Sequence, residues 1–238
     1  MTFYDLSYEQ QCERLQVAAQ QALARYGLSG ARLELIAYVS NAVFRVTHSS
    51  GRFALRLHLP GRKPAAWVRS ELLWLMALNS ETDVYVPTPV LTSDGALLSE
   101  AKFNDEDPPL FCSLFGWIEG EFWTQSLRDE QAVMLGRVLA RLHCHAARFD
   151  LPAGFARPRL DVASMFGSGS PYYVHDDGAV FTAAQRELFA AVEARVQTVM
   201  HELGESAQHF GLIHGDFLAK NYLFTTRGIA VIDFDDCA

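Results

Sequence analysis

The most constraining feature of this 238-residue chain is a group of polar residues near its end. His214, Asp216 and Asn221 share one short segment, and two apolar runs joined by a turn at residues 226–228 follow it. Apolar runs on either side of a glycine-containing turn predict a β-hairpin. The second run leads directly into Asp233, so the hairpin should return this carboxylate to the side of Asn221. The sequence therefore predicts one loop and one hairpin that gather two carboxylates and an amide.

Such a set of oxygen atoms is suited to phosphoryl transfer. This reaction needs a carboxylate to orient the attacking hydroxyl group, and oxygen ligands that hold a divalent cation against the phosphates. Asp216, Asn221 and Asp233 have the side chains for these tasks, and Mg²⁺ is the cation that they favour. For Asp235 the sequence leaves two readings, a further position beside the metal, which we favour, or a cap of the next helix or a solvent-facing side chain.

The rest of the sequence predicts an α+β protein. Apolar residues recur at helical spacing in four segments, which are residues 7–26, 67–78, 129–148 and 182–203. Short runs rich in β-branched, aromatic and leucine residues predict strands at residues 33–36, 43–47, 53–59, 84–91, 110–117 and 210–213. This order indicates an N-terminal antiparallel sheet crossed by one helix, followed by a mainly helical part. The sequence changes character at Gly120, so we place the two parts at residues 1–119 and 120–238.

Composition limits the class of partner. Half of the residues are hydrophobic and 12% are aromatic, which favours a globular protein, and the net charge of −8 comes without any block of Lys or Arg. This argues against nucleic acid or an anionic membrane surface as a partner and favours a small molecule. The four cysteines lack metal-binding spacing and are expected to be reduced, buried thiols. With no apolar run long enough for a membrane span and no leader pattern, we expect a cytoplasmic protein.

The order of the motifs resembles the catalytic core of the protein-kinase-like superfamily. That core has the order His-x-Asp-x-x-x-x-Asn, a hairpin, and then an apolar residue, Asp, Phe and an acid, which here are residues 214–221 and 232–235. Its details are similar to the aminoglycoside phosphotransferase and choline kinase branch, which includes bacterial type II homoserine kinases, fructosamine kinases and a stress-response protein kinase. The resemblance implies a two-lobed protein-kinase-like fold with Asp216 as the catalytic base. It also implies that Asn221 and Asp233 bind Mg²⁺ and that His214 holds the loop.

The same resemblance implies positions for ATP in the N-terminal lobe. A β-turn between the first strands covers the phosphates in this family, and Ser40 and Asn41 stand at the matching place, although no glycine-rich loop is present. Backbone groups near Gly116 and Ile118, where the two lobes connect, would bind the adenine edge.

Arg56 stands where a protein kinase carries its phosphate-binding lysine, within the predicted strand at residues 53–59. The resemblance implies that Glu71, on the following helix, forms an ion pair with it. A guanidinium group can bind phosphate through two nitrogens, so the departure from lysine is compatible with the role. An alternating strand also often shows one charged residue to solvent, and this simpler reading stays open for Arg56.

The function that the resemblance implies is an ATP-dependent phosphotransferase that moves the γ-phosphate to a hydroxyl or amine of a small molecule, with ATP and Mg²⁺ as cofactors. Two alternatives are a protein Ser/Thr kinase of the stress-response type and a nucleotide-binding pseudokinase or fragment without turnover. Family members usually continue with further helices, so we expect the chain, which ends at Ala238, to be a fragment or an unusually short member with an incomplete C-terminal lobe. The sequence identifies neither the acceptor nor the oligomeric state.

Overall fold

The N-terminal part of the protein is built on an antiparallel sheet. The computed structural model describes residues 2–103, 108–123, 126–168, 170 and 180–238. The first three strands are β1 (Arg32–Tyr38), β2 (Asn41–His48) and β3 (Gly51–His58), which pair in sequence order. The sheet continues with β6 (Leu110–Gly116) and then β4 (Pro89–Val90), and β5 (Ser99–Ala101) also pairs with β6. This confirms the predicted antiparallel N-terminal sheet.

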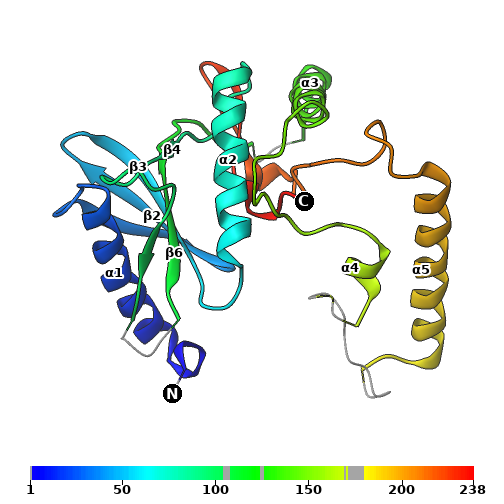
Figure 1. The fold of residues 1–238 in the computed structure, drawn as a ribbon, viewed down its shortest axis with the longest axis horizontal. Helices are drawn as coiled ribbons and strands as arrows, with labels where there is room; N and C mark the ends of the chain where they lie inside the picture. Colours follow the sequence, from blue (N-terminus) through cyan, green and yellow to red (C-terminus); the bar gives the residue numbers. More distant parts are fainter. Residues whose placement is uncertain (1, 104–107, 124–125, 169, 171–179) are drawn as a thin grey trace.

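One face of the sheet is covered by helix α1 (Tyr8–Arg25) (Figure 1). The side chain of Ser7 accepts a hydrogen bond from the Gln10 N–H, which satisfies one of the free donors at the start of the helix. Alternate residues of β2, among them Phe44 and Val46, are fully buried in the core that this helix forms with the sheet. The alternation turns the intervening residues toward the opposite face.

Helix α2 (Ala65–Glu81) lies between the sheet and the C-terminal part of the chain (Figure 1). Its buried residues belong to a second core that also includes residues of α3, of the C-terminal hairpin and of the segment after it. Trp74 of α2 meets Phe234 edge to face, with ring centroids 5.3 Å apart. Aromatic pairs of this geometry stabilise a core beyond the area that they bury. One helix thus connects the sheet to the region that carries Asp233.

The C-terminal part is mainly helical. It contains α3 (Asp129–Ala146), the short α4 (Val162–Phe166), α5 (Ala183–Leu203) and the hairpin of β7 (Tyr222–Thr225) and β8 (Gly228–Val231). Two single turns, η2 (Ala219–Asn221) and η3 (Phe234–Asp236), flank the hairpin, and a third, η1 (Phe3–Asp5), begins the chain. Helix α5 is capped by Thr182, at the start of the segment predicted to be helical, and it has no buried residue.

The segment that connects the two parts lies against the hairpin. Glu121 and Phe224 exchange both backbone hydrogen bonds, at 3.0 and 2.9 Å. A Cβ atom on Gly120 would lie 2.9 Å from Cβ of Leu223 and from Cγ2 of Thr225, closer than real Cβ atoms come. Glycine is therefore required at the point where the chain leaves the sheet.

Two predicted strands are wrong. Of residues 84–91, only Pro89–Val90 pairs in the sheet, because Pro87 and Pro89 have no N–H to donate. Tyr85 instead accepts a hydrogen bond from the Val231 N–H in the hairpin. The strand that pairs with this edge of β6 is Ser99–Ala101. It was not predicted, because Ser99 and Glu100 are polar. Residues 210–213 form no strand, and Ile213 exchanges backbone hydrogen bonds with Ala238.

The cysteines are only partly as expected. All four are free, but Cys144 is exposed and Cys12 half-buried, while Cys112 and Cys237 are buried. Within the described residues, no helix combines the length and the apolar character that a membrane crossing requires.

Candidate active site

The loop between residues 214 and 221 is held by the ring of His214. Its Nε2 lies 3.0 Å from the Ile232 carbonyl oxygen, and its Nδ1 lies 3.3 Å from the backbone nitrogen of Asp216. A neutral ring with its proton on Nε2 satisfies both contacts, since Nδ1 then accepts the Asp216 N–H. Burial lowers the pKa of His214 below its ordinary value, which favours this neutral form. His214 thus holds the loop to the residue that follows β8, which agrees with the role that the resemblance implies.

Gly215 allows the loop to pass close to the end of the chain. Its φ of 82° lies in the left-handed region, and a Cβ atom there would be 2.0 Å from the carbonyl oxygen of Asp236. No side chain fits at that distance, so the loop and η3 can approach only because this residue is glycine.

Asp216 is positioned by the two residues that end the loop. Its Oδ2 accepts a hydrogen bond of 2.8 Å from Nδ2 of Asn221 and lies 3.2 Å from Nζ of Lys220. Among the residues that the structure describes, none donates a hydrogen bond to Oδ1 of Asp216. The side chain is 24% exposed, so a hydroxyl group brought to the loop could reach this oxygen.

The orientation of Asn221 suits a hard divalent cation. Its Nδ2 donates to both the carbonyl oxygen and Oδ2 of Asp216, each at 2.8 Å. The amide oxygen, which is the atom that a metal ion requires, is therefore directed away from Asp216. The Asn221 carbonyl accepts the Ile232 N–H at 2.9 Å, so the hairpin brings the residue before Asp233 next to Asn221, as predicted. The residues present fit a Mg²⁺ ion held by Asn221 and Asp233.

Asp233 has an unusual backbone conformation. Its φ of 62° and ψ of 63° make it the one residue other than glycine with a positive φ in the described part of the chain. Asp and Asn tolerate this left-handed conformation better than most residues. The turn redirects the chain from β8 into η3 and leaves the Asp233 side chain 45% exposed.

Arg56 is not a solvent-facing residue of its strand, since it is only 8% exposed. Its Nη1 lies 2.7 Å from Oε1 of Glu71 and its Nη2 lies 3.1 Å from Oδ1 of Asp233. Burial alone would lower the pKa of Arg56, but the charges of Glu71 and Asp233 reverse this and raise it, so the guanidinium group stays charged. Burial raises the pKa of Glu71, and Arg56 opposes that shift. The predicted ion pair between β3 and α2 is present.

The other positions predicted to bind ATP lie at the start of β2 and at the end of β6. Asn41 directs its side chain to Asp235, whose Oδ2 accepts a hydrogen bond from Asn41 Nδ2 at 2.7 Å. Ser40 is exposed in the turn before β2. The N–H of Gly116 donates to the carbonyl of Thr88, so it is already occupied within the sheet, and Ile118 is half-buried beyond the end of β6. Asn41 therefore belongs to a contact with η3.

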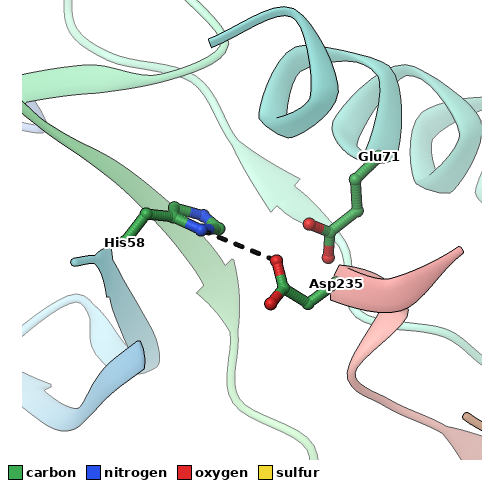
Figure 2. Close-up of side chains that lie close together, drawn as sticks. All are labelled: His58, Glu71 and Asp235. Atoms are coloured by element: carbon green, nitrogen blue, oxygen red, sulfur yellow. Dashed lines mark ion pairs between the residues drawn. The ribbon is translucent and has the colours of Figure 1, made fainter. Parts of the chain in front are cut away.

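A second group of buried polar residues lies beside the Arg56–Glu71 pair, and sequence reasoning missed most of it. His58, Glu71 and Asp235 lie close together in Figure 2, and one ligand atom from each falls within 4.8 Å of the others. Lys63 joins them, with Nζ 2.7 Å from Oδ2 of Asp235. Asp235, for which a position beside the metal was favoured, contacts Lys63 and Asn41 through its carboxylate.

Comparison with known proteins places these motifs in a family. A sequence model described as the phosphotransferase enzyme family, APH, matches residues 33–238. The microcompartment-associated aminopropanol kinase is 32% identical, with a TM-score of 0.79, over 94% of this chain and 70% of that one.

Two more distant structures share the fold. The amicoumacin kinase hAmiN, solved with AMP-PNP, Ca²⁺ and Ami, is 17% identical with a TM-score of 0.74, over 98% of this chain and 67% of that one. The spectinomycin phosphotransferase APH(9)-Ia, solved with ADP and spectinomycin, is 18% identical with a TM-score of 0.56, over 98% of this chain and 70% of that one. The match over residues 33–238 establishes that the chain belongs to the phosphotransferase enzyme family and has its protein-kinase-like fold.

Proposed function

We propose that the protein transfers the γ-phosphate of ATP to a hydroxyl group of a small amino alcohol, with Mg²⁺ as cofactor. In this assignment residues 1–119 form the nucleotide-binding lobe and residues 120–238 the catalytic lobe. The observation that carries the proposal is the position of Asp216, whose Oδ2 is held by Asn221 at 2.8 Å while Oδ1 accepts no hydrogen bond from a described residue. The identity of 32% to an aminopropanol kinase supports an acceptor that carries both an amine and a hydroxyl group.

Asp216 would act on the acceptor. Its Oδ1 accepts the hydrogen of the acceptor hydroxyl, orients the oxygen toward the phosphate and takes the proton as the phosphate is transferred. The hydrogen bond from Asn221 keeps the carboxylate from rotating, which matters because phosphoryl transfer depends mainly on position. The ammonium group of Lys220, 3.2 Å from Oδ2, adds a positive charge near the point of transfer.

Arg56, Asn221 and Asp233 would hold the donor. Arg56 binds phosphate oxygens, while Oδ1 of Asn221 and the carboxylate of Asp233 bind the cation. Mg²⁺ would neutralise charge on the phosphates when it is bound there. Glu71 keeps Arg56 in place from α2, at 2.7 Å. Ser40, Gly116 and Ile118 stay predicted contacts for the rest of the nucleotide.

The test is ADP production over a panel of amino alcohols, homoserine, choline, sugars and aminoglycosides. We expect an amino alcohol to give the highest turnover and Asp216→Asn to reduce kcat by about 100-fold or more while Mg²⁺–AMP-PNP still binds. Asp94→Asn is the control, because Asp94 is an exposed aspartate paired with Arg25. Turnover unchanged in Asp216→Asn would contradict the mechanism. Autophosphorylation without any small acceptor would favour the protein kinase, and Mg²⁺-dependent nucleotide binding without turnover would favour the pseudokinase.

A further inference from the structure

The carboxylate of Asp235 is the centre of the contacts between η3 and the N-terminal lobe. Asp235 is 4% exposed. Its Oδ2 accepts hydrogen bonds from Nδ2 of Asn41 and pairs with Nζ of Lys63, both at 2.7 Å. Its Oδ1 lies 3.6 Å from Nδ1 of His58 and 3.9 Å from Nη1 of Arg56. One side chain of the C-terminal segment thus meets four side chains of the other lobe.

These four partners come from three different parts of the N-terminal lobe. Asn41 begins β2, Arg56 and His58 lie in β3, and Lys63 stands in the segment between β3 and α2. Asp235 lies two residues after Asp233, in the same turn. Movement of Asp235 away from its partners would therefore also move Asp233, which is in contact with Arg56 at 3.1 Å.

The backbone of η3 is held by side chains from both lobes. Nζ of Lys63 also donates to the Asp235 carbonyl at 2.6 Å. Arg157, from the segment before α4, donates to the carbonyl oxygens of Asp235 and Cys237 and to that of Trp67 in α2. Other residues therefore hold both the side chain and the backbone of Asp235, and these contacts restrict the rotation of the turn.

A metal ion is the competing explanation for the cluster in Figure 2, since His58, Glu71 and Asp235 offer one nitrogen and two carboxylate oxygens. The charges argue against it. The two carboxylates already face two cations, Arg56 at 2.7 Å from Glu71 and Lys63 at 2.7 Å from Asp235. A divalent cation would have to lie beside the guanidinium group in a buried environment, where like charges repel strongly. The arrangement is better explained as a set of ion pairs between the lobes.

We propose that Asp235 is a positioning residue of the active site, whose buried carboxylate holds β2, β3 and the segment before α2 against η3 and so keeps Asp233 aligned with Arg56. The assignment rests on the proposed function, because it gives Asp235 a task in the site where Mg²⁺–ATP would bind. Asp235 need not touch the nucleotide or the metal. It acts through Asp233, and its loss should raise the Mg²⁺ concentration that nucleotide binding requires.

The decisive variant is Asp235→Asn, which removes the charge and keeps the size of the side chain. We measure the binding of AMP-PNP by calorimetry at increasing Mg²⁺ concentration, and kcat and KM where turnover is present. The Mg²⁺ concentration for half-maximal binding should rise about tenfold, and kcat should fall about 10- to 100-fold, as expected for a displaced ligand. KM for the acceptor should change less than about threefold.

Asp236→Asn is the matched control. It removes an equal charge one residue further along, where the side chain is 59% exposed and contacts Lys63 at 3.0 Å but is not bound to Asn41. Its effect on Mg²⁺ dependence should stay within about twofold, because exposed ion pairs contribute little. Equal effects of the two variants would overturn the positioning role, since charge alone would then explain the result.

A double variant tests the pairing itself. Asn41→Asp combined with Asp235→Asn exchanges the amide and the carboxylate across their 2.7 Å hydrogen bond. We expect the exchange to return the Mg²⁺ concentration for half-maximal binding to within about threefold of that of the original protein. Asn41→Asp alone places two carboxylates together, so it should raise this concentration more than Asp235→Asn or the double variant does. If Asp235→Asn does not fold, as judged by circular dichroism, Lys63→Met supplies the same measurement and should shift the Mg²⁺ dependence in the same direction.

The outcomes separate this proposal from the proposed function. If the original protein shows no Mg²⁺-dependent binding of AMP-PNP, the proposed function fails and the positioning role fails with it. If binding is normal and Asp235→Asn retains it with only a lower melting temperature, the function stands and the positioning role is overturned. One zinc ion per chain by elemental analysis, lost in Asp235→Asn, would also overturn it in favour of a metal site.

Discussion

Nη2 of Arg56 lies 3.1 Å from Oδ1 of Asp233, so the proposed phosphate-binding cation and the proposed metal-binding carboxylate meet directly. The other terminal nitrogen, Nη1, lies 2.7 Å from Glu71. One planar guanidinium group therefore serves two carboxylates from different elements, which the single nitrogen of a lysine could not do with the same geometry.

Arg56→Met should lower the free energy of unfolding by about 3–5 kcal/mol, because it leaves Glu71, 1% exposed, as a buried carboxylate without its partner. Urea unfolding measures this change. The double variant Arg56→Met with Glu71→Leu should recover most of the stability, since apolar side chains can replace a buried ion pair. It should not recover nucleotide binding. A double variant as unstable as the single one would contradict the importance of the buried charge.

Asp233→Asn should retain the fold and lose Mg²⁺-dependent nucleotide binding. Asn tolerates the left-handed conformation that Asp233 adopts, at φ 62°, so the turn should persist without the negative charge. Asp233→Ala is the comparison, because alanine lacks this tolerance and should cost about 1–2 kcal/mol more in stability. Chemical unfolding and calorimetry give the two quantities, and equal stability of the two variants would argue against strain at this position.

Gly215→Ala should lower the free energy of unfolding by about 3 kcal/mol or more, since a Cβ atom would lie 2.0 Å from the Asp236 carbonyl oxygen at a positive φ. The matched control is Gly211→Ala, four residues earlier, where the added Cβ would meet no atom within 4 Å. The control should change stability by less than about 0.5 kcal/mol. Similar melting temperatures for the two variants would show that η3 does not approach the loop this closely.

His58 should make the protein sensitive to acid. Burial lowers the pKa of His58 from 6.5 to about 3, an effect that Arg56, Lys63 and Arg157 increase and Asp235 opposes. The folded pKa lies below the unfolded one, so the stabilisation is complete above pH 6.5 and is lost as the pH falls toward 3.

Between about pH 4.5 and 6, His58 should contribute a slope of about 1.4 kcal/mol of unfolding free energy per pH unit, equal to one proton. In His58→Gln this part of the slope should disappear. His48→Gln, at the half-buried C-terminal end of β2, is the control and should keep it. Parallel pH profiles of the original protein and His58→Gln would contradict the burial of a neutral ring.

Local patterns predicted the elements that depend on neighbouring residues. The hairpin formed where apolar runs flank Gly228, and helix α5 began after Thr182, whereas the Arg56–Glu71 pair was implied by the resemblance to the kinase-like superfamily. Each of these features is encoded within about twenty residues of sequence. The strand predicted at residues 84–91 failed because two prolines removed hydrogen-bond donors from an otherwise apolar run.

The contacts of Asp235 could not be predicted in this way. Its partners Asn41 and Lys63 are separated from it by 194 and 172 residues, and no spacing in the sequence relates them. Lys63 lies two residues after a Pro-Gly pair and directly before Pro64, a pattern that is typical of an exposed turn. Only the packing of β2 and β3 against η3 reveals that these residues belong to one cluster.

The connection between the lobes has a fixed length. Because Glu121 is paired with Phe224 in both directions and Gly120 fits against Leu223 only without a side chain, one inserted or deleted residue between β6 and Glu121 would shift that pairing out of register. Loops elsewhere on a protein surface usually tolerate such changes. In this chain the short segment between β6 and Glu121 sets the distance between the two lobes. We expect family members of different length to carry their insertions in other loops.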